Sequence, residues 1–309
     1  MEENMKYGNE YRFTLIGGDK RIASLAKALA SRGHTVNVCK SSEDLSVCGG
    51  IKVYSSFEKA IADGDFTVLP MPISRDGVHV LASVGDAEEQ ILIEDVFNCA
   101  KRNGVQYIFG GNIGKNITKT AENKGVSLID YSLSEEFLQS NAEATAEGGI
   151  MVAMENTDIT IKDSPVLIGG YGRIAKYLTK LLLSMGADVT VAARKDEALS
   201  HASSLGCNVI KIGDPDETEK FKQAIKNSRI IFNTVPSLIF KEELIGKKNS
   251  ATYIELASCP GGIDLRGARD AGMNIIFAPS LPGRYSPESA GGYIFNSIYK
   301  NLKERVIYI

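Results

Sequence analysis

The chain has 309 residues, of which 43% are hydrophobic and 24% charged, and its formal net charge is −3. This length suits two domains, because a single hydrophobic core stops growing at roughly 250–300 residues. The composition is that of a soluble globular protein. The sequence has no lysine- or arginine-rich run, so we expect no nucleic-acid partner.

No segment reaches the roughly 18 consecutive apolar residues of a membrane-spanning helix, and the first residues do not have the pattern of a signal peptide. The five cysteines form no C-x-x-C pair, and we interpret them as reduced thiols. We therefore expect a cytoplasmic protein without membrane contact. The histidines, His34, His79 and His201, lie far apart in the sequence, and we predict no metal site.

The first part of the chain alternates apolar strand-like runs with helical patterns, which is typical of parallel βαβ units. A strand leads through Gly17 and Gly18 into an amphipathic helix, and this turn lacks the full G-x-G-x-x-G pattern of a dinucleotide site. The expected elements are strands over 13–18, 35–39, 65–72, 106–111 and 127–131, and helices over 20–32 and around Glu89 to Asn103.

A helical pattern from Ser134 to about Thr157 begins with an N-cap serine and two glutamates in the first turn, which predicts a long helix joining two domains. Strands then follow over 165–170, 187–194, 229–236, 251–258 and 274–280, with a helix over 173–185 and a last helix over 286–306. We expect an α/β fold of two Rossmann-like domains with mostly parallel sheets, in which the last helix returns to the first domain. The expected boundaries are 1–150 with 285–309, and 151–284.

The stretch VLIGGYGRIA, residues 166–175, contains the pattern G-x-G-x-x-A between a predicted strand and a predicted helix. Gly170 permits a tight turn, Gly172 lets the backbone approach a pyrophosphate, and Ala175 lets the helix pack close to the sheet. The N-terminus of the helix attracts phosphate. The motif predicts a dinucleotide site with the cofactor-binding residues Gly170, Tyr171, Gly172, Arg173 and Ile174.

The end of the next predicted strand indicates which dinucleotide is bound. NAD sites place an acidic residue about 20 residues after the motif, whereas NADP sites place an arginine there. In this chain Ala193 is followed by Arg194 and Lys195, with no carboxylate at the strand end. These cations predict NADP, the alternative being that both are solvated loop residues.

Three segments with proline and glycine follow later strands, FNTVPS, ELASCPGGID and APSLPGRYSP, and we expect them to surround the nicotinamide unless they are ordinary turns. From them we predict further cofactor-binding residues, Thr234, Val235, Pro236, Ala257 and Ser258. In the first domain, a helix N-terminus with an arginine suits a carboxylate ligand. We predict the substrate-binding residues Gly18, Asp19, Arg21 and Arg75, although both arginines are also compatible with plain surface positions.

Taken together, these segments resemble the A subunit of dipicolinate synthase. The resemblance rests on T-A-E-G, L-A-S-x-P-G-G and L-P-G-x-x-x-P-x-x-A-G, which are far more specific than the glycine pattern, and it is weakest between Ser41 and Lys124. Its segments are GGDKR (17–21), NAEATAEGGIMVAMENTDITI (141–161), GGYGRIAKYL (169–178), ADVTVAARK (187–195), NTVPS (233–237), LASCPGGID (256–264) and APSLPGRYSPESAG (278–291).

The resemblance implies an NADP-dependent oxidoreductase of sporulation, on a branch of the lysine and diaminopimelate pathway. Its dicarboxylate substrate would be dihydrodipicolinate, formed from 4-hydroxytetrahydrodipicolinate, and its product dipicolinate. The implied partner is the flavoprotein-like B subunit of dipicolinate synthase, and a homo-oligomer is compatible with the sequence.

Thr145 and Glu147, both in T-A-E-G, are our candidate catalytic residues, with Glu147 as the acid–base group. Alternatively, Glu147 only ties its helix to a loop. Two other functions remain open: another two-domain NAD(P)-dependent dehydrogenase of the alanine or hydroxy-acid type, or a non-catalytic regulatory protein that binds NADPH.

Overall fold

The computed structural model describes residues 10–82 and 90–306. By their internal contacts these residues form two compact units. Unit 1 contains the residues up to Ser140 and those from Ser286 onward, and unit 2 contains Asn141–Tyr285. The helices among the described residues are all too short or too polar to span a bilayer.

Unit 1 is built on a six-stranded parallel sheet with the strand order β3-β2-β1-β4-β5-β6. This is the doubly wound order, and the chain reverses direction across the sheet between β1 and β4. The elements are β1 (Arg12–Ile16), α1 (Lys20–Ala30), β2 (Thr35–Cys39), β3 (Ile51–Tyr54), α2 (Phe57–Ala62), β4 (Phe66–Val68), α3 (Ile93–Arg102), β5 (Tyr107–Gly110), α4 (Lys115–Lys124), β6 (Leu128–Asp130), η1 (Tyr131–Leu133) and α12 (Pro287–Val306).

Unit 2 repeats the same strand order, β12-β11-β10-β7-β8-β9, with all pairs parallel. The helix α5 (Glu135–Glu155) begins in unit 1 and continues into unit 2. The other elements are β7 (Pro165–Gly169), α6 (Arg173–Ser184), β8 (Asp188–Ala193), α7 (Asp196–Ser204), β9 (Asn208–Lys211), η2 (Pro215–Glu217), α8 (Thr218–Asn227), β10 (Ile230–Asn233), α9 (Glu242–Ile245), β11 (Thr252–Glu255), α10 (Leu265–Asp270), β12 (Asn274–Phe277) and α11 (Leu281–Tyr285).

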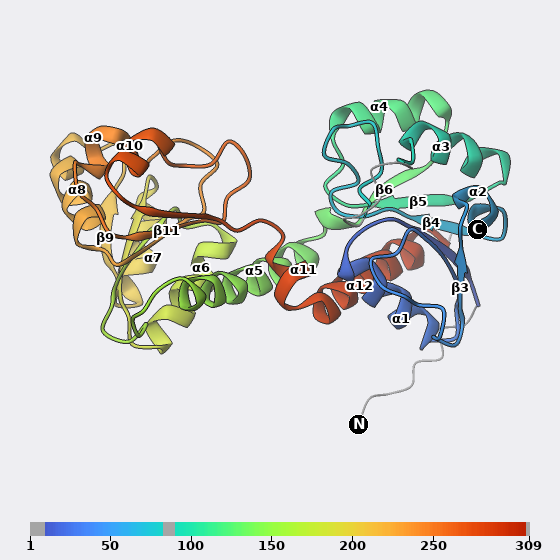
Figure 1. Cartoon of the computed structure of the whole chain (residues 1–309), viewed down its shortest axis with the longest axis horizontal. Coiled ribbons are helices and arrows are strands. Elements are labelled where there is room, and N and C mark those ends of the chain that lie inside the picture. Colours follow the sequence, from blue (N-terminus) through green and yellow to red (C-terminus); the bar gives the residue numbers. More distant parts are fainter. Residues whose placement is uncertain (1–9, 83–89, 307–309) are drawn as a thin grey trace. The chain divides into compact units, whose positions relative to one another are not determined.

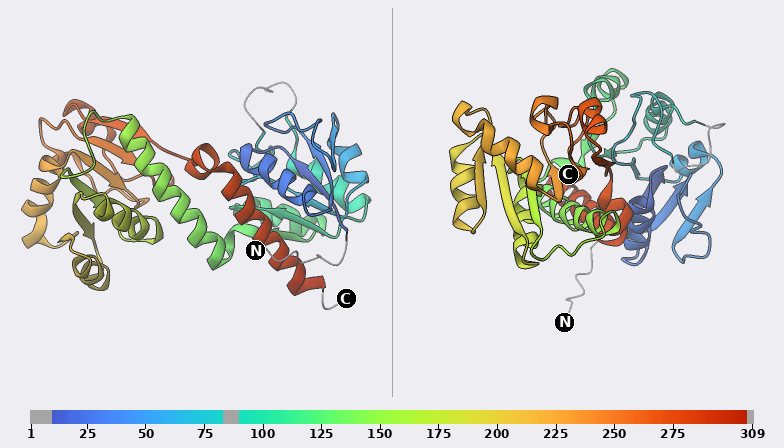
Figure 2. Two further views of the ribbon diagram at one scale, coloured as in Figure 1. Left: turned by 90° about the horizontal axis from the view of Figure 1, so that it is seen from below. Right: turned by 60° about the vertical axis from the view of Figure 1, so that its left-hand side comes forward.

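Helices cover both faces of the unit 1 sheet, with α3 and α4 on one face and α1 beside α12 on the other (Figures 1 and 2). Leu25 and Leu29 of α1 and Ile298 of α12 are fully buried in the core of that second face. Each such side chain stabilises the fold by roughly 1.5–3 kcal/mol. Gly291 lets α12 approach α1 closely, because a Cβ atom there would lie 2.9 Å from the carbonyl oxygen of Arg21.

The structure confirms the expected fold of two Rossmann-like units with parallel sheets, joined by a long helix, with the last helix packed on the first unit. Two strands were not predicted, β3 and β9. The segment after β12 was expected to be a loop, but Leu281–Tyr285 form the short helix α11, with Leu281 to Gly283 buried. Helix α3 begins at Ile93, and Glu89 lies outside the described residues.

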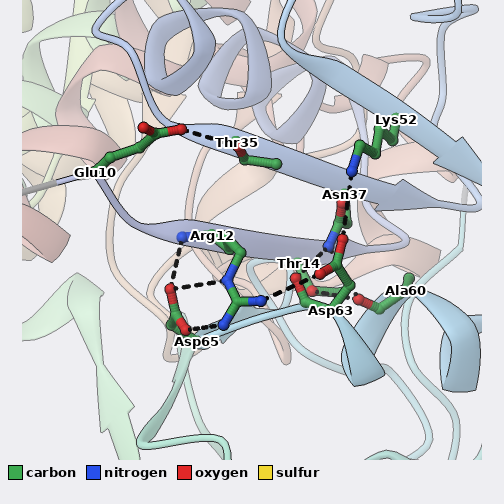
Figure 3. Close-up of polar contacts among 9 residues, drawn as sticks. All are labelled: Glu10, Arg12, Thr14, Thr35, Asn37, Lys52, Ala60, Asp63 and Asp65. Carbon is green, nitrogen blue, oxygen red and sulfur yellow. Dashed lines mark hydrogen bonds and ion pairs between the residues drawn. The ribbon is translucent and has the colours of Figure 1, made fainter.

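A polar cluster fixes the amino ends of the central strands of unit 1 (Figure 3). The Arg12 guanidinium lies 2.7 Å from Asp65 Oδ1 and 3.2 Å from Asp63 Oδ1. The backbone N–H of Arg12 donates to Asp65 Oδ2 at 2.9 Å. Thr14 donates to the carbonyl oxygen of Ala60. These bonds join the turn between α2 and β4 to β1, at the end of the sheet opposite the one where such folds bind ligands.

His34 is a buried histidine, 3% exposed, between the start of β1 and α12. Its Nδ1 accepts the Tyr11 N–H at 3.3 Å, so Nε2 carries the proton and donates to the Tyr299 hydroxyl at 3.1 Å. Burial lowers the pKa of His34; the carboxylate of Glu10 acts against this shift and the cation of Arg32 adds to it.

Unit 1 should therefore lose stability when the pH falls from 7.5 to 5.5. Below the ordinary histidine pKa of about 6.5 the unfolded chain binds a proton that the folded chain resists, so acid favours unfolding. Calorimetric melting should show a larger fall in Tm for the wild type than for His34→Gln, by roughly 2–4 °C for each 1 kcal/mol lost. Equal falls in both proteins would contradict this account of His34.

Candidate functional site

The turn between β7 and α6 has the geometry of a phosphate-binding loop. Gly170 has φ +94°, and a Cβ atom there would lie 2.5 Å from Val235 Cγ2, so only glycine fits. Gly172 is the N-cap of α6, is exposed, and has no atom within 4 Å of the position a Cβ would take. Ala175 is fully buried against the sheet. The three small residues therefore have the separate roles that the motif predicts.

The other residues of the turn differ in what they can offer a ligand. Tyr171 is 8% exposed, and its hydroxyl lies 2.8 Å from Nδ1 of His201 on α7. Its side chain thus anchors the turn to α7, which leaves only its backbone for a ligand. Arg173 is exposed and Ile174 is half-buried. His201 was not predicted to belong to the site, because nothing in the sequence connects it to the turn.

Arg194 and Lys195 follow the end of β8 at Ala193, the strand beside β7. Both are exposed, and neither side chain makes a hydrogen bond or ion pair with any residue in 10–82 or 90–306. The next residue, Asp196, is a carboxylate that the strand-end argument did not consider. Its Oδ1 lies 2.8 Å from Nζ of Lys211. The free charge at the strand end is therefore positive.

The loop after β10 lies against the glycine turn. The backbone N–H and the hydroxyl of Thr234 both donate to the carbonyl oxygen of Gly169, at 2.9 and 2.8 Å. Val235 is half-buried and Pro236 is exposed. Thr234 and Val235 thus lie beside the turn.

The loop after β11 depends on a residue that the sequence analysis missed, the buried carboxylate of Glu255, which is 3% exposed. Its Oε1 accepts from Asn233 Nδ2 at 2.7 Å and from the Ala257 N–H at 3.0 Å. Its Oε2 accepts from the Tyr253 hydroxyl and the Gly262 N–H, both at 2.8 Å. Four donors bind the two carboxyl oxygens and fix the loops after two neighbouring strands.

A signal for this network is present in the sequence. Asn233 and Glu255 end their strands at paired positions, and both are polar residues that close an apolar run. Gly262, in the loop after β11, packs closely against Asn233, because a Cβ atom at Gly262 would lie 2.3 Å from Asn233 Nδ2. Of the other predicted residues here, Ala257 is half-buried and Ser258 exposed.

In unit 1, the polar groups of the corresponding turn, which follows β1, form hydrogen bonds with other groups of the protein. Asp19 caps α1 by accepting the Arg21 N–H at 3.0 Å, and the Gly18 N–H donates to the Leu81 carbonyl at 2.7 Å. The Arg21 guanidinium, 5% exposed, lies 2.7 Å from Asp19 Oδ2 and donates to the Met71 carbonyl at 2.6 Å. Arg21 is therefore no surface residue, and the roles of Gly18, Asp19 and Arg21 in substrate binding stay predictions.

Arg75 lies on the loop after β4, is exposed, and its side chain has no hydrogen bond or ion pair within the part of the chain that the structure describes. The loop itself is ordered by Asp76, which accepts the N–H groups of Val78 and His79 at 2.8 and 2.9 Å. Hydrogen bonds from the His79 side chain and from these backbone groups hold the pKa of Asp76 well below its usual range. Arg75 remains available to an anionic ligand.

The two candidate catalytic residues lie on the part of α5 that belongs to unit 2. Thr145 is 8% exposed, and its hydroxyl donates to the Asn141 carbonyl at 2.6 Å. Glu147 is exposed and its side chain makes no hydrogen bond to any described residue. Gly148 and Gly149 pack toward Leu281 and toward Leu256.

Two doubly wound units, one of which has an open glycine turn, define the class of two-domain Rossmann-type proteins. Within it, residues 12–132 match the family described as the N-terminal domain of the dipicolinate synthase A subunit. Over 298 residues the chain is 29% identical to the A subunit of dipicolinate synthase from Bacillus subtilis (strain 168), covering 95% of this chain and 96% of that protein. The resemblance found in the sequence is thereby confirmed.

Solved structures agree with this comparison. The A chain of dipicolinate synthase from Bacillus subtilis has a TM-score of 0.78 at 25% identity, covering 96% of this chain and 97% of that one. The A subunit from Bacillus halodurans has a TM-score of 0.81 at 24% identity, with coverage of 94% and 97%. A transhydrogenase from Sinorhizobium meliloti shares the fold alone, with a TM-score of 0.64 at 16% identity and coverage of 95% and 93%.

Gly172→Val should abolish dinucleotide binding and leave the protein folded, because an added Cβ has no protein atom within 4 Å and the side chain extends into the space that a pyrophosphate needs. Gly114→Val is a matched control. Gly114 is also an N-cap glycine without a side-chain cap bond, it also has no atom within 4 Å, and it lies in unit 1.

Calorimetric titration with NADP and thermal melting separate the two effects. Both variants should lose a similar, small amount of stability, about 1 kcal/mol or less. Only Gly172→Val should lose binding. Unchanged affinity in a folded Gly172→Val protein would mean that the motif is only a turn.

Proposed function

We propose that this chain is the A subunit of a dipicolinate synthase and that it oxidises dihydrodipicolinate to dipicolinate with NADP. The observation that carries the proposal is the similarity to the Bacillus subtilis A subunit, which extends over 95% of this chain and 96% of that protein. A shared fold alone would not support a particular reaction, because one fold hosts many functions. Similarity over both full lengths, with motifs at the strand ends, supports this one.

We place NADP at the turn between β7 and α6 of unit 2. The open N-cap at Gly172 leaves room for a pyrophosphate, and the N-terminus of α6 offers its dipole to the phosphates. Arg194 and Lys195 are exposed cations whose side chains have no partners among the described residues, and they suit a 2′-phosphate better than a ribose hydroxyl. The network around Glu255 would hold the loops that surround the nicotinamide.

The reaction needs positioning more than powerful acid–base chemistry. Oxidation of the dihydro compound removes one hydride, which NADP accepts, and one proton, and the product ring is aromatic. Loss of water from the 4-hydroxy compound would precede this step and would need a group that moves a proton. Glu147, whose exposed side chain has no hydrogen-bond partner in the described residues, is our candidate, with the Thr145 oxygen nearby in the sequence.

For the dicarboxylate substrate we propose unit 1, with Arg75 as the free cation and with Gly18, Asp19 and Arg21 shaping the turn after β1. The remaining parts of the proposal follow from the similarity: a cytoplasmic enzyme of sporulation, on a branch of the lysine and diaminopimelate pathway, that works with a flavoprotein-like B subunit.

An assay of the whole chain tests the function. The protein is mixed with 4-hydroxytetrahydrodipicolinate and NADP, with and without the B subunit, while NADPH and the ultraviolet absorbance of dipicolinate are followed. Both products should form in equal molar amounts, because each ring that becomes aromatic releases one hydride. NADPH without dipicolinate would indicate another dehydrogenase, and NADPH binding without either product would indicate a regulatory protein.

In this assay Glu147→Gln should lower kcat by roughly 10²- to 10⁴-fold while the affinity for NADP stays unchanged, since general acid–base groups contribute about that factor. Glu143→Gln is the matched control, because Glu143 is exposed on the same helix and its side chain likewise has no hydrogen bond to a described residue. If both variants keep the wild-type kcat, Glu147 is not the acid–base group.

A further inference from the structure

Lys211, the last residue of β9, lies at the strand end where Arg194 leaves β8. It is paired in register with Ala193, and the N–H of Ile212 donates to the Ala193 carbonyl at 2.9 Å. The Lys211 N–H donates to Glu217 Oε2 at 3.3 Å, which helps to fix the backbone here. The side chain of Lys211 therefore starts from a defined position beside the predicted 2′-phosphate site.

The ammonium group of Lys211 pairs with the carboxylate of Asp196, the first residue of α7. Nζ lies 2.8 Å from Oδ1 and 3.1 Å from Oδ2, so it contacts both oxygens. The Lys211 side chain is 40% exposed and that of Asp196 is 78% exposed. A pair this exposed adds little to the stability of the fold, so its main effect is on the charge of the surface around it.

The effect of the Lys211–Asp196 pair on surface charge follows from the other charges at this strand end. Arg194, Lys195 and Lys211 are cations, whereas Asp196 and Glu197 are carboxylates in the first turn of α7. With Lys211 present the sum is +1. Without Lys211 the sum is zero. The carboxylate of Asp196, two residues after Arg194, would then be unpaired; it would repel a phosphate and accept a hydrogen bond from a ribose hydroxyl.

We propose that Lys211 determines cofactor specificity by neutralising Asp196, and thereby makes this strand end accept a 2′-phosphate. This inference rests on the proposed NADP-dependent function and adds a residue that the strand-end motif does not contain. Arg194 and Lys195 attract the phosphate directly. Lys211 is a positioning residue that acts through Asp196.

The test compares the dissociation constants of NADP and NAD, measured by calorimetric titration of the full chain at low salt. Lys211→Met should weaken NADP binding about five- to tenfold, because the carboxylate that it leaves unpaired repels the phosphate across solvent-exposed surroundings, where charge interactions are weak. NAD binding should change less than about twofold. The double variant Lys211→Met/Asp196→Asn should regain most of the NADP affinity, and Tm should stay close to wild type.

Lys27→Met is the matched control, because Lys27 forms an exposed pair with Glu43 at 2.7 Å in unit 1, which does not contain this strand end. It should leave both affinities unchanged. The inference is overturned if Lys211→Met keeps the NADP preference, if it weakens NAD and NADP equally, or if the double variant shows no recovery. A wild-type protein that binds NAD as tightly as NADP would instead contradict the proposed cofactor, so the two failures are distinguishable.

Discussion

Six parallel strands end at one edge of each sheet, and the peptide groups of the turns beyond them need partners. In unit 1 the protein supplies those partners itself: Asp19 caps α1, the Leu81 carbonyl accepts from Gly18, and Arg21 binds Asp19. In unit 2 the turn at Gly172 has no side-chain cap. The same strand order thus produces one closed turn and one open turn, and only the open turn suits a phosphate.

Two carboxylates illustrate how position decides what a charge does. Glu255 is buried, accepts four hydrogen bonds, and acts as a fixed centre for the loops after β10 and β11. Glu147 is exposed and its side chain makes no hydrogen bond within the described residues. The difference between the two carboxylates is one of position: the four donors fix the orientation of Glu255, whereas no hydrogen bond fixes that of Glu147.

The sequence was sufficient to predict the elements with strong patterns. The glycine turn, the joining helix and the last helix were predicted within a few residues, because caps and apolar periodicity mark them. Strands β3 and β9 were missed because both are short edge strands with mixed burial. The bonds of His201 to Tyr171 and of Lys211 to Asp196 could not be predicted, since each joins α7 to a residue that only the folded structure brings near it.

Helix α12 has a consequence for how the protein is made. Unit 1 consists of two separate stretches of chain, and the second follows the whole of unit 2. Until that stretch leaves the ribosome, the apolar side of α1 that packs against Phe295 and Ile298 has no cover. Unit 2 is one continuous stretch and can complete its core earlier, so during synthesis the second unit finishes folding before the first.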